Sequence, residues 1–90
     1  MNDEQLALLR TMKYGVLSLR ILGYQGQQQG LTKQQSEIIA DLADAIHNIP
    51  EAIESKSIDL KFHTNTMLGG FSQKYKNNPD APDLLNMGGS

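Results

Sequence analysis

The sequence predicts an all-α protein: a small helical bundle of three main helices plus a short helix after Pro50, followed by a disordered C-terminal tail. Apolar residues recur every three or four positions in three long segments, which is the spacing of one helix face. Nowhere do apolar and polar residues alternate for long enough to make a sheet strand. Because 90 residues can bury only one modest core, we expect a single helical domain over residues 1–76 and a flexible tail over residues 77–90.

The first helix is expected from about residue 3 to residue 22. Asn2 or Asp3 can cap its start, and Gly23 is expected to end it. The segment GYQGQQQG that follows has three glycines and four glutamines, so it is predicted to be a mobile loop. Its glycines lack the Lys-Ser/Thr ending of a phosphate-binding loop. The apolar residues that predict this helix are Leu6, Leu9, Met12, Val16 and Leu19.

The capping-box pattern Thr32–Gln35 predicts the start of the second helix. This helix is expected to stop or bend near Asn48, because Pro50 has no N–H to donate and disfavours helical geometry at Ile49. We therefore expect a chain-reversing structural corner at His47, Asn48 and Pro50. In this corner Asn48 would be left-handed, Ile49 extended, and Pro50 would open a short helix. The apolar face of the second helix is Ile38, Ile39, Leu42, Ile46 and Ile49.

Ser57 is expected to cap the third long helix, which is predicted to continue through Gly69-Gly70 with local weakness. Each glycine costs about 1 kcal/mol relative to alanine in a helix interior. Beyond Lys76 the chain has two prolines and few large apolar residues, which is typical of an extended tail. The face that predicts the third helix is Leu60, Thr64, Met67, Leu68, Phe71 and Tyr75.

The composition excludes several classes of function. The formal net charge is −2 and there is no run of Lys or Arg, so we expect no nucleic-acid partner. The absence of cysteine excludes disulfide scaffolds, thiolate zinc sites and thiol nucleophiles. No apolar stretch approaches the roughly 20 residues of a membrane-spanning helix, and the N-terminus begins with acids where a secretory signal has bases. We expect a cytoplasmic protein with no membrane association and no cofactor.

The second helix carries one cluster that could hold chemistry. Glu37, Asp41 and Asp44 form one ridge with Asn48, on the side away from the apolar face. Such acids could act as metal ligands in a carboxylate-metal nucleotide hydrolase, but a bundle metal site draws further ligands from a second helix. His47 near the negative end of the helix dipole has a structural explanation. We therefore assign no catalytic residue and no metal ligand, and keep the hydrolase as an alternative.

The first helix offers a surface for binding. It is apolar over more than half of its circumference, more than one partner helix covers, so the remainder requires a third helix or a second subunit. Lys13 and Arg20 lie on one line of this helix beside Leu17, either as binding residues or as long side chains that reach solvent from a central core helix. Around a twofold axis, these bases would reach the acidic ridge of the other subunit. The candidate binding residues are Lys13, Leu17, Arg20, Glu37, Asp41 and Asp44.

The segment LADAIHNIPEAI, with the pair Lys74-Tyr75 further on, resembles a pattern in uncharacterised small bacterial helical proteins. The matching residues are Ala40-Asp41 and Ala45–Pro50, and the resemblance extends over about residues 5 to 76. Some of those proteins look like immunity-type partners of toxins. The resemblance implies a non-enzymatic binder and names no partner.

These observations predict a small non-enzymatic protein-binding module, of an immunity or regulatory type, that forms a homodimer. The alternatives are the carboxylate-metal hydrolase and a purely structural homodimer subunit of a larger assembly.

Overall fold

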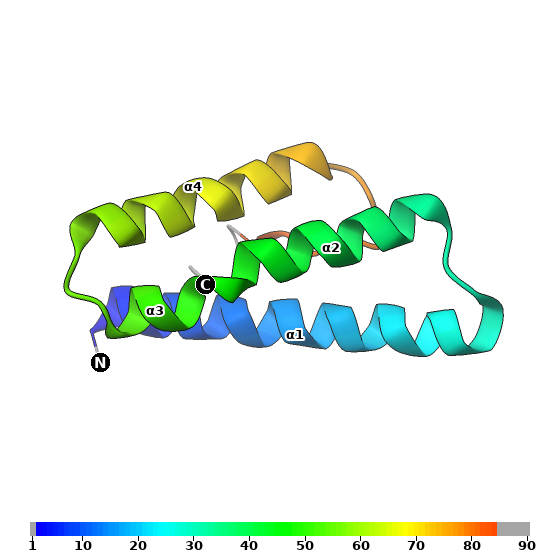
Figure 1. The fold of residues 1–90 in the computed structure, drawn as a ribbon, viewed down its shortest axis with the longest axis horizontal. Coiled ribbons are helices and arrows are strands. Elements are labelled where there is room, and N and C mark those ends of the chain that lie inside the picture. The colour runs from blue at the N-terminus through cyan, green and yellow to red at the C-terminus, as the bar shows by residue number, and fades with distance from the viewer. Residues whose placement is uncertain (1, 85–90) are drawn as a thin grey trace.

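The computed structural model describes residues 2–84. It confirms the all-α prediction, since the described residues contain four helices and no strand (Figure 1). The helices are α1 (Asp3–Gln29), α2 (Lys33–His47), α3 (Ile49–Glu54) and α4 (Ile58–Lys74).

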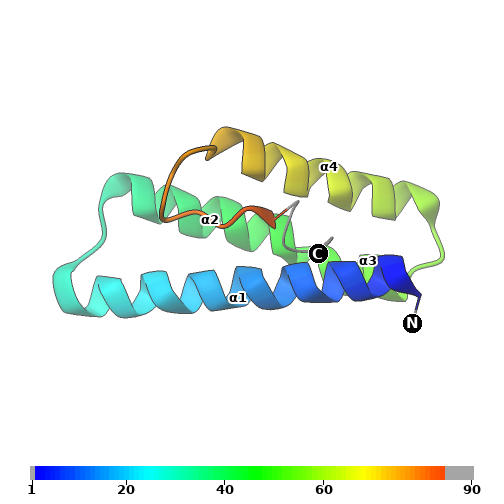
Figure 2. The same cartoon turned by 180° about the vertical axis from the view of Figure 1, so that it is seen from behind.

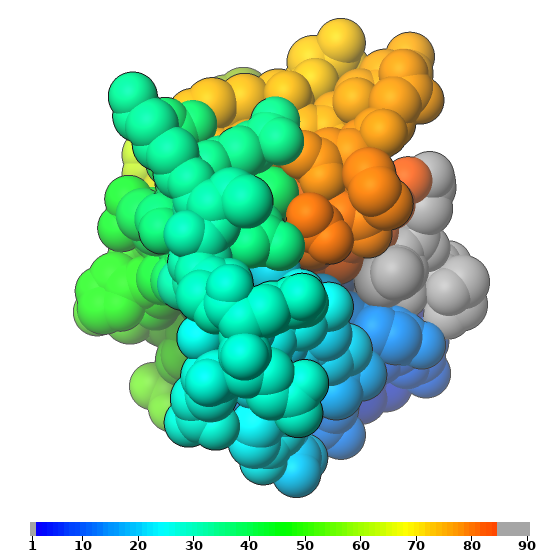
Figure 3. Space-filling view, turned by 90° about the vertical axis from the view of Figure 1, so that its right-hand side faces the viewer, coloured from blue at the N-terminus to red at the C-terminus, as the bar shows by residue number. Residues whose placement is uncertain are grey.

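The central element of the fold is the bent rod formed by α2 and α3. Both α1 and α4 pack on this rod, and no Cα atom of α1 lies within 8 Å of a Cα atom of α4. Residues 77–84 cross the space between α1 and α4, as Figure 2 shows from behind and Figure 3 shows from the end. The bundle therefore has three helical walls and a fourth wall made of the turns and irregular chain of residues 77–83.

The core lies where α2 and α3 meet their neighbours. Ile38, Leu42 and Ile49 are fully buried, and burying a side chain of this size stabilises the fold by about 1.5–3 kcal/mol. α1 comes close to α2 at Gly15, where an added Cβ would lie 2.6 Å from Ile46 Cγ2. Only glycine permits this approach of the two helices without a shift of Ile46. The buried apolar residues are Leu8, Leu22, Ile38, Leu42, Ala45, Ile46, Ile49, Ala52, Ile53, Leu68, Phe71, Tyr75 and Leu84.

The helix starts follow the predicted caps. The Asn2 side chain accepts a hydrogen bond from the Gln5 N–H at 2.8 Å, and the Thr32 hydroxyl accepts one from the Gln35 N–H at 3.1 Å. In both boxes the glutamine side chain accepts the N–H of the capping residue in return. Ser57 caps α4, which continues through its glycine pair as expected.

The predicted end of the first helix at Gly23 is wrong, because α1 continues to Gln29. The segment expected to be a mobile loop forms the last two turns of the helix. Glutamine is a good helix former. The Leu31 side chain packs closely on Gly26, where an added Cβ would lie 2.9 Å from Leu31 Cγ. The helix ends at Gly30, whose φ of 77° is in the left-handed region that glycine adopts without strain.

The predicted corner at His47, Asn48 and Pro50 is confirmed in part: α2 ends at His47 and Pro50 lies in the first turn of the short helix α3, but the chain does not reverse here. Asn48 is right-handed, with φ −86° and ψ −6°, and Ile49 is the first residue of α3. The Asn48 side-chain amide donates to Met67 Sδ at 3.3 Å, and Ile49 is buried in the core. These contacts hold the backbone helical against the preference of a residue before proline. The chain bends here, and it reverses instead at residues 30–32 and 55–57.

The predicted flexible tail from residue 77 packs against the helices in its described part. Leu84 is 1% exposed, its N–H donates to Ser72 Oγ at 3.2 Å, and Pro82 is buried. Asn77, with a φ of 70°, turns the chain back after α4. The packed domain therefore extends past the predicted boundary at residue 76 to residue 84, and residues 85–90 of the predicted tail lie outside the described part of the chain.

Candidate functional site

The outer face of α1 carries a line of exposed apolar side chains. Tyr14, Leu17, Ile21 and Tyr24 are between 43% and 52% exposed, although each is large and apolar enough to favour burial. Their spacing of three, four and three residues is that of the a and d positions of a coiled coil. We call these four residues the α1 seam. The residues by which α1 packs on the core, such as Gly15, lie on another face of the helix.

Basic side chains border the α1 seam on one flank. Lys13 and Arg20 are exposed at the positions that a coiled coil labels g, next to the seam. The Arg20 guanidinium lies 5.5 Å from the centre of the Tyr24 ring, a cation–π contact that fixes the arginine along the seam. From Gln5 to Gln29 the helix contains no acid, so this face of α1 is positive.

The other flank of the α1 seam borders a cleft of about 300 Å³. Ser18 and Gln25, at the positions labelled e, form its α1 wall, and residues 79–83 form the opposite wall. Asp80 and Asp83 belong to that opposite wall. The two flanks of the seam therefore differ in charge, with bases on one side and carboxylates on the other.

The acidic ridge of α2 faces α4. Lys74 Nζ lies 2.7 Å from Asp41 Oδ2, and the Tyr75 hydroxyl donates to the same oxygen. The hydrogen bonds from Lys74 and then from Tyr75 hold the pKa of Asp41 below its usual value. Asp41 in turn raises the pKa of Lys74, and burial followed by the Asp41 contact raises the pKa of Tyr75. Lys74 of the same chain thus supplies a base beside Asp41.

The candidate binding residues fall on two separate surfaces. Lys13, Leu17 and Arg20 share the outer face of α1. Asp41 contacts α4, while Glu37 and Asp44 are exposed on α2. The Asp41 side chain is 35% exposed although it contacts Lys74 and Tyr75, so none of the three acids points into the core. Of the corner residues, His47 and Pro50 are exposed and Asn48 bonds to α4.

Within residues 2–84 no group of three or more His, Asp or Glu side chains is placed to hold a metal ion. An open cleft of about 280 Å³ is lined by Asp41, Asp44 and Lys74. The Lys74 ammonium and the Tyr75 hydroxyl both contact Asp41 Oδ2, so a cation in this cleft would bind next to the positive charge of Lys74.

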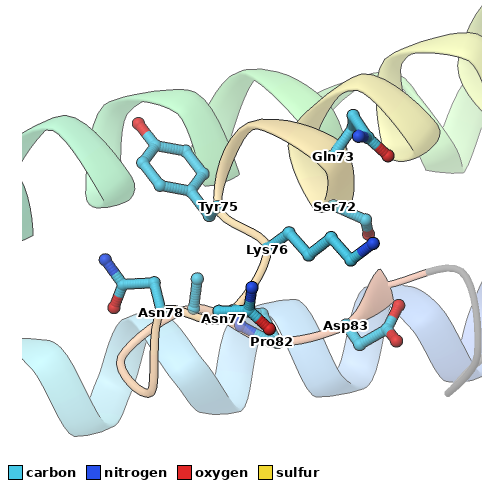
Figure 4. Close-up of a pocket in the computed structure, with 9 residues that line it drawn as sticks. Ser72, Gln73, Tyr75, Lys76, Asn77, Asn78, Pro82 and Asp83 are labelled. Atoms are coloured by element: carbon cyan, nitrogen blue, oxygen red, sulfur yellow. The ribbon is translucent and has the colours of Figure 1, made fainter.

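A third cleft, of about 410 Å³, lies between the end of α4 and residues 77–83 (Figure 4). Its walls are mainly polar, and Lys76 extends along it on the side away from Tyr75. A smaller apolar pair, Ile58 and Phe62, is exposed near the start of α4. None of these features combines apolar and charged groups over as long a surface as the α1 seam does.

Sequence reasoning found Lys13, Leu17 and Arg20 but missed Tyr14 and Tyr24. Tyr24 was assigned to a loop by the predicted helix end at Gly23, so the seam was cut short. The heptad spacing from Tyr14 to Tyr24 was the signal that could have identified the whole line.

Comparison with family models, with curated proteins and with solved structures finds no match. No helix in the described part of the chain is long and apolar enough to cross a membrane.

Proposed function

We propose that the protein is a small non-enzymatic binding module that pairs α1 with a helix of another protein chain. The observation that supports this function is the α1 seam, four large apolar side chains exposed at heptad spacing on a helix of 27 residues. A contiguous apolar line rimmed by charge on a small protein is typical of an interaction surface. Helix pairing would cover the seam without any change in the core.

The flanking charges define the chemistry of the partner. Arg10, Lys13 and Arg20 give α1 three bases with no acid between Gln5 and Gln29. Charged side chains beside the seam set the choice and orientation of a helical partner. The fitting partner therefore presents an amphipathic helix with large apolar side chains in its seam and carboxylates beside that seam, from the helix itself or from a neighbouring segment.

This proposal includes the immunity or regulatory type, because such proteins act by covering a surface of another protein. The alternative hydrolase depends on Glu37, Asp41 and Asp44 as ligands. The Asp41 carboxylate already accepts hydrogen bonds from Lys74 and Tyr75, so the geometry favours binding over metal chemistry.

A synthetic heptad peptide tests the function. One peptide carries Leu at its a and d positions and Glu at e and g, and its matched control carries Lys at e and g. We expect the acidic peptide to shift the amide NMR signals of residues 13–24, and to lose this effect with Leu17→Glu. The function is refuted if neither peptide shifts these signals in wild type at a dilution where it is monomeric, or if both act equally on wild type and variant.

A further inference from the structure

The charges beside the α1 seam distinguish the two ways in which two copies of this helix could pair. In an antiparallel pair the g positions of the two helices face each other, so with Leu17 opposite Ile21 the Arg20 side chains of the two copies would lie beside each other. Like charges at such positions oppose association. Repulsion between like charges therefore disfavours an antiparallel pair of α1 helices.

In a parallel pair each g position lies beside an e position of the other helix. Lys13 of one copy then lies beside Ser18 of the second copy, and Arg20 beside Gln25 of the second copy. Both Ser18 and Gln25 line the cleft whose far wall contains Asp80 and Asp83. Lys13 and Arg20 of one copy would therefore lie beside the acidic cleft of the other copy.

We infer that the partner of the α1 seam is a second copy of this chain, paired in parallel about a twofold axis. This inference rests on the proposed function and names its partner. Lys13 and Arg20 of each copy occupy the acidic cleft between α1 and the C-terminal segment of the other, and Asp80 is the main counter-ion. The cleft of one copy supplies the carboxylates, and the second copy supplies the two basic side chains, Lys13 and Arg20.

The seam and the cleft belong to one continuous surface. Ile21 is a member of the α1 seam and also lines the cleft, so apolar and ionic contacts adjoin. In parallel register, Tyr14, Leu17, Ile21 and Tyr24 each face their own counterparts, as a and d residues do. The C-terminal segment therefore takes part in recognition as well as in closing the core.

Engineered cysteines test the polarity, since the chain has no cysteine of its own. Leu17→Cys places identical d positions face to face in the parallel pair, within the Cα separation of about 4.4–6.8 Å that a disulfide needs. In an antiparallel pair, Leu17 would instead face Ile21 of the other copy. We expect Leu17→Cys alone to form a disulfide-linked dimer under mild oxidation. A mixture of ¹⁵N-labelled Leu17→Cys with unlabelled Ile21→Cys should give little mixed dimer by mass spectrometry.

Charge reversal tests the ionic half of the inference. Arg20→Glu should weaken the dimer by about tenfold, because the reversal occurs twice in a symmetric pair. Adding Asp80→Lys should restore most of the affinity, and Lys56→Glu, on the α3–α4 connection, is the matched control that should change nothing. Dominant mixed cysteine dimers, or no rescue by Asp80→Lys, would overturn the parallel arrangement. A wild-type monomer at every concentration that still binds the acidic peptide would overturn the second copy as partner and leave the proposed function standing.

Discussion

Replacing Thr64 by valine is expected to stabilise the protein. Thr64 is fully buried on α4, and its hydroxyl has no hydrogen-bond partner among the described residues. A buried hydroxyl without a partner costs about 1–3 kcal/mol in mutational data. Thr64→Val removes that cost and adds a buried methyl group, worth about 0.8 kcal/mol. Both residues are β-branched, so the helix propensity hardly changes.

The matched control is Thr11→Val on α1. Thr11 is also buried, at 3% exposed, but its hydroxyl donates to the Ala7 carbonyl at 3.0 Å. Removing this hydrogen bond costs about 0.5–1.5 kcal/mol, which is comparable to the gain of about 0.8 kcal/mol from the added methyl group, so the net change in stability is close to zero or negative. The two variants therefore make the same chemical change in opposite hydrogen-bonding environments.

Thermal unfolding followed by circular dichroism measures both effects. The lower ends of the two terms add to a gain of about 2 kcal/mol at Thr64, which raises the melting temperature by roughly 8–16 °C for a domain of this size. Thr11→Val should lower the melting temperature or leave it unchanged. A Thr64→Val variant that melts below wild type, or that behaves like Thr11→Val, would show that the Thr64 hydroxyl is hydrogen-bonded in the folded protein.

Three further substitutions test the packing and the electrostatics. Gly15→Ala should cost about 1–3 kcal/mol in a denaturant titration, because the new methyl group would overpack against Ile46; an unchanged midpoint would contradict the close approach. Gly23→Ala, with no heavy atom within 4 Å of its added Cβ, should instead stabilise by about 0.5–1 kcal/mol, and a loss of stability would argue against a helix through this position. Asp41→Asn should cost about 0.5–1 kcal/mol at pH 7, since the ion pair with Lys74 is partly exposed. The folded protein lowers the pKa of Asp41, so the stability from this ion pair is present above pH 3.8, the usual pKa of the group, and is lost as the pH falls below that value. Acid titration should therefore reduce the difference in unfolding free energy between wild type and Asp41→Asn. A difference that stays constant with pH would refute the ion pair.

Local patterns predicted the helix starts because a cap depends only on neighbouring residues. Thr32 and Gln35 form their capping box irrespective of the rest of the fold, and Ser57 caps α4 in the same way. The end of α1 was harder to predict than its start, because glycine occurs both at residue 23, inside the helix, and at residue 30, where the helix ends. Only Gly30 adopts a positive φ, and nothing in the local sequence distinguishes it from Gly23.

The errors at the bend and in the tail have a non-local cause. Asn48 stays right-handed beside Met67, and Leu84 is buried beside Ser72, in each case through a contact made across the fold. Hydrophobic periodicity identifies which residues seek burial, but it does not say which element covers them.

Only part of the candidate site could be predicted, because its remaining contacts also join residues that are far apart in the sequence. The bases of α1 and the acids of α2 were both visible in the sequence as lines of charge. That Asp41 pairs with Lys74, 33 residues further along the chain, depends on how α2 and α4 pack. The cleft lined by Asp80 was not visible in the sequence either, because it forms only when residues 79–83 pack beside α1.

Sedimentation equilibrium of wild type and Leu17→Glu tests most directly whether the α1 seam is an interaction surface. We expect wild type to gain mass with concentration and Leu17→Glu to remain a monomer. Because Leu17 is 47% exposed, the variant should melt within about 3 °C of wild type at a dilution where both are monomeric. Leu8→Glu, at a position only 4% exposed, is the control that should unfold. A Leu17→Glu variant that unfolds as Leu8→Glu does, beside a wild type that stays monomeric, would show that the outer face of α1 belongs to the core.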